Sequence, residues 1–136
     1  MAELSRIGVA IDSDLLEQFD QHITRKGYNN RSESFRDLIR EALVHEASES
    51  PEAKVVATVT LVYDHHVRML SEKLNEMQHD SHHLILSTLH VHLDHDNCLE
   101  VIVMKGKSRD VRRMADALIS TKGVRHGQLA VTTAGL

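Results

Sequence analysis

Histidine is the chemically most versatile residue of this chain, and it is unevenly distributed. Eleven of the 136 residues are histidine, and six of these lie just before the single cysteine, Cys98: His79, His82, His83, His90, His92 and His95. In a predicted strand, His90 and His92 share one face, with Cα atoms about 6.5 Å apart. Cys98 opens the next strand, so a hairpin turn brings its sulfur back towards His92. The spacing therefore predicts a metal site.

A fourth ligand comes from His79, His82 or His83, or from a histidine of another chain. Three nitrogens and one thiolate suit tetrahedral Zn(II) or square-planar Ni(II) or Cu(II), and the spacing leaves this choice open. Four protein ligands leave no open position for a substrate, which favours sensing or structure over catalysis. Glu100 shares the strand face of Cys98 and is expected to accept the second N–H of a ligand imidazole. The alternative for Glu100 is a solvated carboxylate.

No catalytic constellation stands out in the sequence. It contains no Gly-rich phosphate loop, no GxSxG elbow and no HExxH motif. The neighbours His65 and His66 are expected to point apart and not to share an ion, as are His82 and His83. The sequence thus predicts a protein that is not an enzyme.

Composition narrows the class of protein further. One cysteine cannot form an intrachain disulfide, which favours a reducing, cytoplasmic location. No apolar run is long enough to span a bilayer and no secretory leader is expected, so no membrane partner is predicted. The net charge of −4 argues by itself against nucleic acid. Residues 1–50 hold 6 basic and 10 acidic side chains, so this segment carries the whole net charge.

The ligands must be positioned by a domain that follows a short linker. The polar stretch 45–53 contains the only proline, Pro51, and we assign residues 1–48 and 54–136 to two domains with a linker at 49–53. In the second domain, strands are expected over 54–63, 84–93, 98–104 and 128–133. Helices are expected over 67–77 and from Ser108 to Gly123. The order βαββαβ is that of a ferredoxin-like fold, which makes the whole chain α+β.

The first domain is too small to close a core by itself. Residues 6–11 alternate, as in a half-buried strand with Ile7 and Val9 on one face. Helices are expected from Asp12 to Gly27 and again from Asn30, with Asn30 or Ser32 as the cap of the second. One strand and two helices bury little apolar surface. We therefore predict a homodimer in which the two strands pair antiparallel over four helices.

Both halves resemble a known family. Arg6–Ile11, Gly27–Glu33 and Arg36-Asp37 resemble a ribbon-helix-helix DNA-binding domain. The run from Thr88 to Glu100, with Gly123–Gly127, closely resembles the nickel-responsive regulator (NikR-type) family. This resemblance implies one Ni(II) per subunit in a planar site made by His90, His92 and Cys98 of one chain and His79 of a neighbouring subunit. It also implies an ACT-like second domain that assembles dimers into a homotetramer.

The resemblance further implies a second cation site between the domains, often filled by potassium. Its carboxylates match Glu33 and Asp37, and its backbone carbonyls match Ile119, Thr121 and Val124. Glu33 and Asp37 are four residues apart on a helix, an unfavourable pair unless a cation lies between them. The alternative is two solvated carboxylates near a helix N-terminus, which the helix dipole favours.

DNA recognition by such a ribbon uses the outward strand face, here Arg6, Gly8 and Ala10. The family usually has hydroxyl residues where this chain has Gly8 and Ala10. Specificity then depends on Arg6, on thymine methyls or on DNA shape. Phosphate contacts are expected from the start of the second helix, with help from two further arginines; these residues are Asn30, Arg31, Ser32, Arg36 and Arg68.

The favoured function is a nickel-responsive repressor in which Ni(II) at the tetramer core enhances binding to double-stranded operator DNA. A first alternative is a metal- or small-molecule-binding ACT module whose DNA-binding half has degenerated, as Gly8 and Ala10 would allow. A second alternative, a metalloenzyme, requires an open coordination position.

Overall fold

The computed structural model describes residues 3–133, and the described chain divides into two compact units between Glu41 and Ala42. The ends of the two predicted domains, residues 1–2 and 134–136, lie outside the described residues. Helix α2 begins in the first unit and ends in the second. The two units are described separately below.

The first unit is built on helix α1 (Ser13–Arg25) and the beginning of helix α2 (Arg31–Glu49). Gly27 adopts the left-handed φ of +88° that ends the first helix, as its position predicts. The predicted cap of α2 is confirmed, because Asn30 Oδ1 accepts a hydrogen bond from the Glu33 backbone N–H at 2.9 Å. Phe19 and Phe35 stack with ring centroids 5.1 Å apart and join the two helices.

The strand predicted over residues 6–11 is not a strand in this structure, where residues 3–12 have no regular secondary structure. A strand is held by hydrogen bonds to a neighbouring strand, and the alternating residues of this segment pair with no strand of the described chain. The apolar residues Ile7 and Val9 are 81% and 61% exposed. A single chain therefore does not form the predicted strand. Its pairing with the same segment of a second copy stays a prediction.

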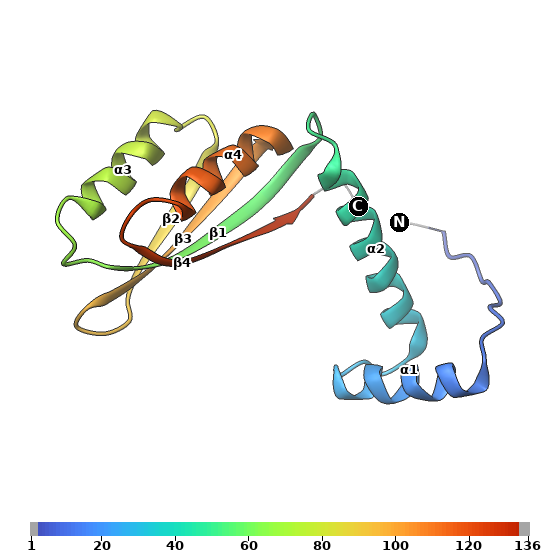
Figure 1. Ribbon diagram of the computed structural model, residues 1–136. Coiled ribbons are helices and arrows are strands. Elements are labelled where there is room, and N and C mark those ends of the chain that lie inside the picture. The colour runs from blue at the N-terminus through green and yellow to red at the C-terminus, as the bar shows by residue number, and fades with distance from the viewer. Residues whose placement is uncertain (1–2, 134–136) are drawn as a thin grey trace. The chain divides into compact units, whose positions relative to one another are not determined.

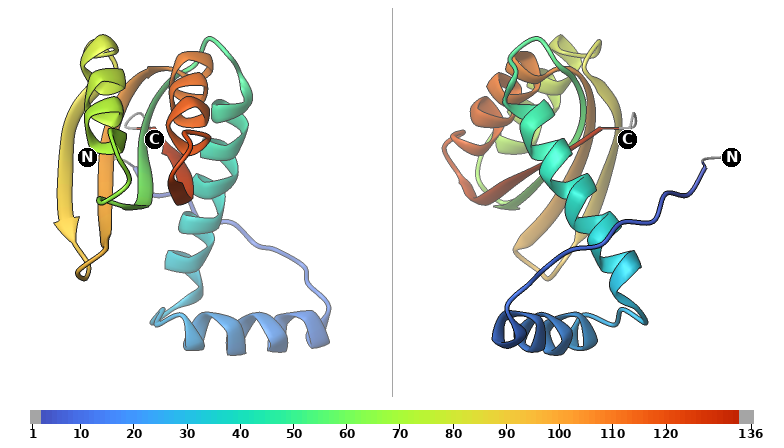
Figure 2. Two further views of the ribbon diagram at one scale, coloured as in Figure 1. Left: turned by 60° about the vertical axis from the view of Figure 1, so that its left-hand side comes forward. Right: turned by 90° about the vertical axis from the view of Figure 1, so that its right-hand side faces the viewer.

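The second unit is a four-stranded antiparallel sheet covered on one face by two helices (Figures 1 and 2). Its elements are β1 (Lys54–Asp64), α3 (Leu70–Asp80), β2 (Ile85–His92), β3 (Asn97–Lys107), α4 (Ser108–Ile119) and β4 (Val124–Thr132). The strand order β2-β3-β1-β4 confirms the predicted ferredoxin-like arrangement. The core lies between sheet and helices and includes Leu61, Leu74, Ile102 and Leu118.

Several boundaries differ from the sequence prediction. Helix α3 begins at Leu70 rather than near Val67, because Met69 has a left-handed φ of +66° and interrupts the chain before it. Helix α4 ends at Ile119, and the chain then turns through Gly123 at φ +103°. Strand β4 starts directly after this glycine, so it is longer than the apolar period alone indicates. Helix α2 continues to Glu49 and takes up the start of the polar stretch 45–53.

Candidate functional site

The pairing of β2 with β3 places the predicted metal ligands in rows on one face of the sheet. His92 pairs with Cys98 and His90 with Glu100, and directly opposed residues of antiparallel strands project to the same side. Cys98 and Glu100 are buried, as are the alternate core residues of β3, so this is the face that the helices cover. Strand β1 adds Tyr63 opposite Cys98. The fold thus gathers a thiol, two imidazoles, a carboxyl and a phenol at one end of the sheet.

The sulfur lies next to one of the two strand histidines. Cys98 Sγ is 3.4 Å from His92 Nδ1, which confirms the prediction that the hairpin folds the sulfur back towards His92. The cysteine is fully buried, whereas His92 is exposed. This arrangement offers a metal ion a route from solvent to a buried thiol.

A third potential ligand, His65, was not predicted. His65 follows β1, and one ligand atom from each of His65, His92 and Cys98 lies within 4.8 Å of the others. The His65 ring meets the His92 ring edge-on at a centroid distance of 5.7 Å. Its Nε2 lies 2.6 Å from the carbonyl oxygen of His95, to which it donates. A neutral imidazole that donates from Nε2 keeps its lone pair on Nδ1, so this contact prepares His65 to bind a metal ion.

The expectation that His65 and His66 point apart is wrong. Their ring centroids are only 4.0 Å apart, because both residues lie in a turn beyond the end of β1 rather than on a strand or helix. A signal for His65 was present in the sequence. The buried residues of β1 are odd-numbered up to Tyr63, and His65 continues that alternation.

His90 and His79 are placed differently from His92. The Nε2 of His90 lies 3.4 Å from the Tyr63 hydroxyl, and its ring centroid is 5.8 Å from that of His92. His79 is exposed near the end of α3, where its ring lies beside that of His82. Neither belongs to a metal-capable group within residues 3–133. Ligation by His90 and by His79 of a neighbouring subunit stays a prediction.

Glu100 pairs with His90 across β2 and β3, and only one of its two carboxylate oxygens accepts a hydrogen bond within the described chain. It is 1% exposed, and its Oε1 accepts a hydrogen bond from Gln78 Nε2 at 2.9 Å. The Gln78 amide oxygen in turn accepts from the Thr88 hydroxyl at 2.9 Å. Glu100 Oε2 is buried without a hydrogen-bond partner in the described chain. A buried carboxylate in this condition is costly, and a nearby cation or imidazolium N–H would relieve it.

In the absence of metal, the Cys98 thiol and the Tyr63 hydroxyl both stay protonated. Burial raises the pKa of the Cys98 thiol, and the negative charges of Glu100, Asp64 and Asp94 raise it further. Burial, followed by the charge of Glu100, also raises the pKa of Tyr63. Tyr63 therefore stays a phenol. Its oxygen can accept a hydrogen bond from His90 Nε2, which leaves the Nδ1 lone pair of His90 free for a metal ion. The Cys98 thiol must lose its proton to a metal ion before it can act as a ligand.

The donor set fits a late first-row metal ion. A soft sulfur and several imidazoles suit Ni(II), Zn(II) or Cu(II), and they are poor ligands for Mg²⁺ or Ca²⁺. The unpartnered oxygen of Glu100 gives an independent sign that positive charge belongs here.

One residue predicted to contact DNA, Arg68, lies in the second unit and is exposed. The others lie in the first unit and are also exposed: Arg6, Gly8, Ala10, Asn30, Arg31, Ser32 and Arg36. The guanidinium of Arg31 already donates two hydrogen bonds to Asp20, from Nε at 2.9 Å and from Nη2 at 2.8 Å. The side-chain oxygen of Asn30 is occupied by the helix cap. Ser32, Arg36 and the free backbone N–H groups of α2 are the better candidates for phosphate contacts.

The residues of the predicted second cation site are divided between the units. Glu33 and Asp37 lie in the first unit, whereas Ile119, Thr121 and Val124 lie in the second. Asp37 accepts hydrogen bonds from the Tyr28 hydroxyl at 2.6 Å and from Arg40 at 3.3 Å. The cation site stays a prediction.

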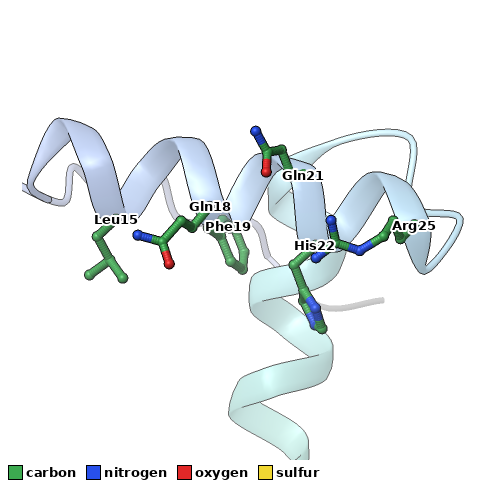
Figure 3. Close-up of a pocket in the computed structure, with 6 residues that line it drawn as sticks. All are labelled: Leu15, Gln18, Phe19, Gln21, His22 and Arg25. Carbon is green, nitrogen blue, oxygen red and sulfur yellow. The ribbon is translucent and has the colours of Figure 1, made fainter.

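The first unit also exposes apolar surface. A shallow hollow runs along α1, lined by Leu15, Gln18, Phe19, Gln21, His22 and Arg25 (Figure 3). Outside this hollow, the exposed apolar side chains of the unit include Ile7, Val9, Leu38 and Ile39. Apolar surface of this extent on a small unit is typical of a protein–protein interface.

None of the described helices is both long enough and apolar enough to cross a membrane.

Comparison with known proteins gives matches in both parts of the chain. Residues 56–132 match the model of the NikR C terminal nickel binding domain, and residues 5–46 match that of the ribbon-helix-helix proteins of the copG family. A putative nickel-responsive regulator of Solibacter usitatus is 70% identical over 135 residues, which is 99% of this chain and 97% of the relative. Putative nickel-responsive regulators of Geobacter sulfurreducens and Nitratidesulfovibrio vulgaris are 58% and 52% identical, with the same coverage.

Proposed function

This chain belongs to the family of nickel-responsive transcriptional regulators, and from that premise we propose that it is a repressor whose operator binding is enhanced by Ni(II) bound at Cys98. The observation that carries the proposal is the approach of the Cys98 sulfur to His92 Nδ1, at 3.4 Å on the buried face of the sheet. The chain is a DNA-binding regulator and not an enzyme. Its ribbon-helix-helix half serves to bind DNA, and its second domain serves to bind nickel.

Cys98, His92 and His90 of one subunit, with His79 of a neighbouring subunit, are the ligands we propose for one Ni(II) per subunit. When bound, the ion supplies positive charge that offsets the Cys98 thiolate and the Glu100 carboxylate. Hydrogen bonds within the chain orient the side chains around this site before the ion binds. Tyr63 orients His90 by a hydrogen bond, and Gln78 orients Glu100 through one carboxylate oxygen. The His95 carbonyl oxygen orients His65, which is a further potential ligand.

Sensing requires that metal binding favour one arrangement of the DNA-binding halves over others. A ligand shifts an equilibrium only by its differential affinity for the two states, and the coupling between two ligands is reciprocal. A ligand set shared between subunits would provide that difference, because only an assembly with both histidine sources in place completes the site. We therefore propose that the protein forms a homodimer through residues 6–11 and a homotetramer through the second domain.

The test is the affinity of the full chain for DNA fragments selected from a genomic library, with and without Ni(II). We expect nickel to tighten binding by about 10-fold or more, within the usual range of coupling between sites. Cys98→Ser should bind DNA as the metal-free protein does at every nickel concentration. His126→Gln, which removes an exposed histidine of β4 away from the site, should behave as the parent protein. Unchanged DNA affinity at saturating nickel would refute the proposal.

Two observations favour a second candidate, a metal-binding module whose DNA-binding half has lost sequence specificity. Gly8 and Ala10 carry no side-chain hydrogen-bond donor or acceptor, and Arg31 is occupied by Asp20. In that case the selection would enrich no common sequence, although nickel would still bind at Cys98.

We also propose a potassium ion at Glu33 and Asp37, completed by the carbonyl oxygens of Ile119, Thr121 and Val124. The repulsion between two carboxylates one helical turn apart supports it. Replacing potassium in the buffer by tetramethylammonium should weaken nickel-dependent DNA binding, and Asp37→Asn should remove the difference between the two buffers.

A cytoplasmic location remains a prediction.

A further inference from the structure

Glu100 places a buried carboxyl group beside the proposed nickel ligands without a basic side chain to neutralise it. The residue is 1% exposed, Gln78 donates to its Oε1 at 2.9 Å, and its Oε2 has no hydrogen-bond partner in the described chain. Within residues 3–133, no lysine or arginine pairs with this carboxyl group. An amide donor orients a carboxylate but does not cancel its charge, so that charge acts on an ion that binds nearby.

Two strands and a helix hold this carboxyl group in place. Glu100 follows Cys98 by two positions on β3, so both side chains project to the same face of the sheet. It also pairs directly with His90 of β2, and directly opposed residues have Cβ atoms about 4.5–5.5 Å apart. From the helix side, Gln78 of α3 accepts a hydrogen bond from the Thr88 hydroxyl at 2.9 Å, which fixes the amide that orients Glu100. The carboxyl group therefore stays next to the proposed ion.

The charge of Glu100 acts across the short distances of this site. Burial is the main cause that raises the pKa of the Cys98 thiol and the pKa of Tyr63, and the charge of Glu100 is the next cause for both groups. A field that makes nearby groups keep their protons also stabilises the positive charge of a bound metal ion. Screening by solvent is weaker in such a buried site than in water.

The charge of the ion decides how much it gains from this field. Every ion that binds through the Cys98 sulfur needs the thiolate, so the thiol proton is released in each case. A divalent ion then brings one more positive charge than a monovalent ion into the same set of donors. The attraction between this additional charge and Glu100 is gained by the divalent ion alone. The discrimination is useful because thiolate ligands by themselves also suit Cu(I).

We propose that Glu100 makes the Cys98 site select divalent over monovalent soft cations, and so favours Ni(II) over Cu(I) by charge. The inference rests on the proposed function, since it requires nickel to bind through Cys98. Glu100 acts as a specificity-determining residue and is not itself a ligand. Glu100→Gln keeps an acceptor for the Gln78 amide and removes the charge, so it isolates the effect of charge from that of the hydrogen bond.

The test compares the Ni(II) and Cu(I) affinities of the full-length protein, each measured by competition with a chelator of known affinity, with Cu(I) kept under anaerobic conditions. We expect Glu100→Gln to lower the ratio of Ni(II) affinity to Cu(I) affinity by about 10-fold, the effect of one unit charge at a partly screened distance of several ångströms. Glu100→Asp retains the charge. It should keep the ratio close to that of the parent protein, even where the shorter side chain weakens the binding of both ions.

Glu72→Gln is the matched control, because it removes an exposed carboxylate from α3, and it should leave the ratio unchanged. A purely structural role for Glu100 would lower both affinities alike, and an unchanged ratio in Glu100→Gln would overturn the inference. A ratio that falls as far in Glu100→Asp as in Glu100→Gln would overturn it as well.

Cys98→Ser separates this inference from the proposed function. If Cys98→Ser binds nickel as tightly as the parent protein, the proposed function fails and the inference fails with it. If Cys98→Ser loses nickel and Glu100→Gln keeps the parent's ratio, the inference alone is wrong.

Discussion

At the residue scale, the proposed nickel site combines a thiol that resists ionisation with a carboxyl group that has one oxygen unsatisfied. Both properties come from burial on the helix-covered face of the sheet, where Cys98 and Glu100 alternate with core residues. Each property is unfavourable in the metal-free protein. The binding of a cation reverses both, so the site exchanges some intrinsic stability for affinity to a positive ion.

The raised pKa of Cys98 predicts the pH dependence of nickel binding. Below that pKa the thiol carries a proton, which must be released when metal binds, so acid weakens binding and base strengthens it. The release of one proton makes affinity rise about 10-fold per pH unit. We expect at least a 100-fold gain between pH 6 and pH 8, measured by competition with a chelator of known affinity.

Equal nickel affinity at pH 5 and pH 8 would show that the thiol is not a ligand. A rise that levels off near the pKa of a free cysteine would instead contradict the effect of burial on Cys98.

Glu100→Gln should separate stability from metal affinity. The glutamine carbonyl oxygen can still accept the hydrogen bond from Gln78, but the buried negative charge is gone. We expect the free energy of unfolding of the metal-free protein to rise by about 1 kcal/mol. Nickel affinity should fall by about 10-fold, because the site loses its compensating charge.

The matched control is Glu72→Gln, which removes an exposed carboxylate from α3. It should leave both the unfolding midpoint in urea and the nickel affinity unchanged. A Glu100→Gln protein that is less stable and binds nickel normally would contradict the role given to this charge.

Sequence alone predicts the residues of this site unevenly, for a clear physical reason. Strand alternation predicts that His90 and His92 share a face, and the hairpin explains the approach of Cys98 to His92. Alternation along β1 places His65 on the same face as Tyr63, but its approach to Cys98 depends on how β1 pairs with β3, and this long-range register has no local signature. The partners of Glu100 depend in the same way on where α3 places Gln78.

At the element scale, the last turn of α2 and the segment that follows it are attached to the start of α4. The buried hydroxyl of Ser108 donates to the Ser48 carbonyl oxygen at 2.8 Å, and Arg112 Nη2 donates to the same oxygen at 3.1 Å. Glu52 forms ion pairs with Lys107 at 3.1 Å and Arg109 at 2.7 Å. The end of α2 is therefore fixed to the domain that holds the metal ligands. This attachment is a candidate route for coupling nickel binding to the DNA-binding half.

Ser108→Ala should weaken that coupling. The substitution removes the hydrogen bond to Ser48 and deprives Arg112 Nε of its acceptor at 3.1 Å. We expect a loss of about 1 kcal/mol in the free energy of unfolding. Nickel affinity in the absence of DNA should stay the same, while the nickel-dependent gain in DNA affinity, measured by fluorescence anisotropy, should fall severalfold.

Ser120→Ala is the control, since it removes an exposed serine hydroxyl just beyond the other end of α4. It should change neither quantity. If Ser108→Ala retains the full nickel-dependent gain, the attachment of α2 to α4 is structural only.

The elements of the second domain follow from their periods, and those of the first only in part. Alternating apolar residues predict β1 and β3 because each buries one face within its own chain. Residues 6–11 have the same alternation, yet they form no strand in the single chain because their exposed apolar face requires a surface that this chain does not provide. The late start of α3 depends on the left-handed Met69, a conformation that is uncommon for a side chain of this kind.

At the scale of the whole molecule, charge and assembly act together. The net charge of −4 resides in residues 1–50, the part that we assign to DNA. Non-specific DNA binding depends on neutralising phosphates with basic side chains, so it should be weak and sensitive to salt. We propose that tight binding comes from the local face of Arg6, Gly8 and Ala10, and we expect this face to form a ribbon only when two copies pair.

Val9→Lys should therefore abolish DNA binding without affecting nickel. Val9 belongs to the exposed apolar face that we expect to be covered in the dimer, and a buried lysine without a partner is costly. We expect the species observed in sedimentation velocity to shift to a smaller assembly and DNA affinity to fall by more than 10-fold. Ala10→Lys adds the same charge one residue further along, on the outward face, so it should keep the assembly and retain or strengthen DNA binding. If both variants keep the parent's assembly and DNA affinity, residues 6–11 do not form the dimer ribbon, and the apolar surface along α1 must be covered in another way.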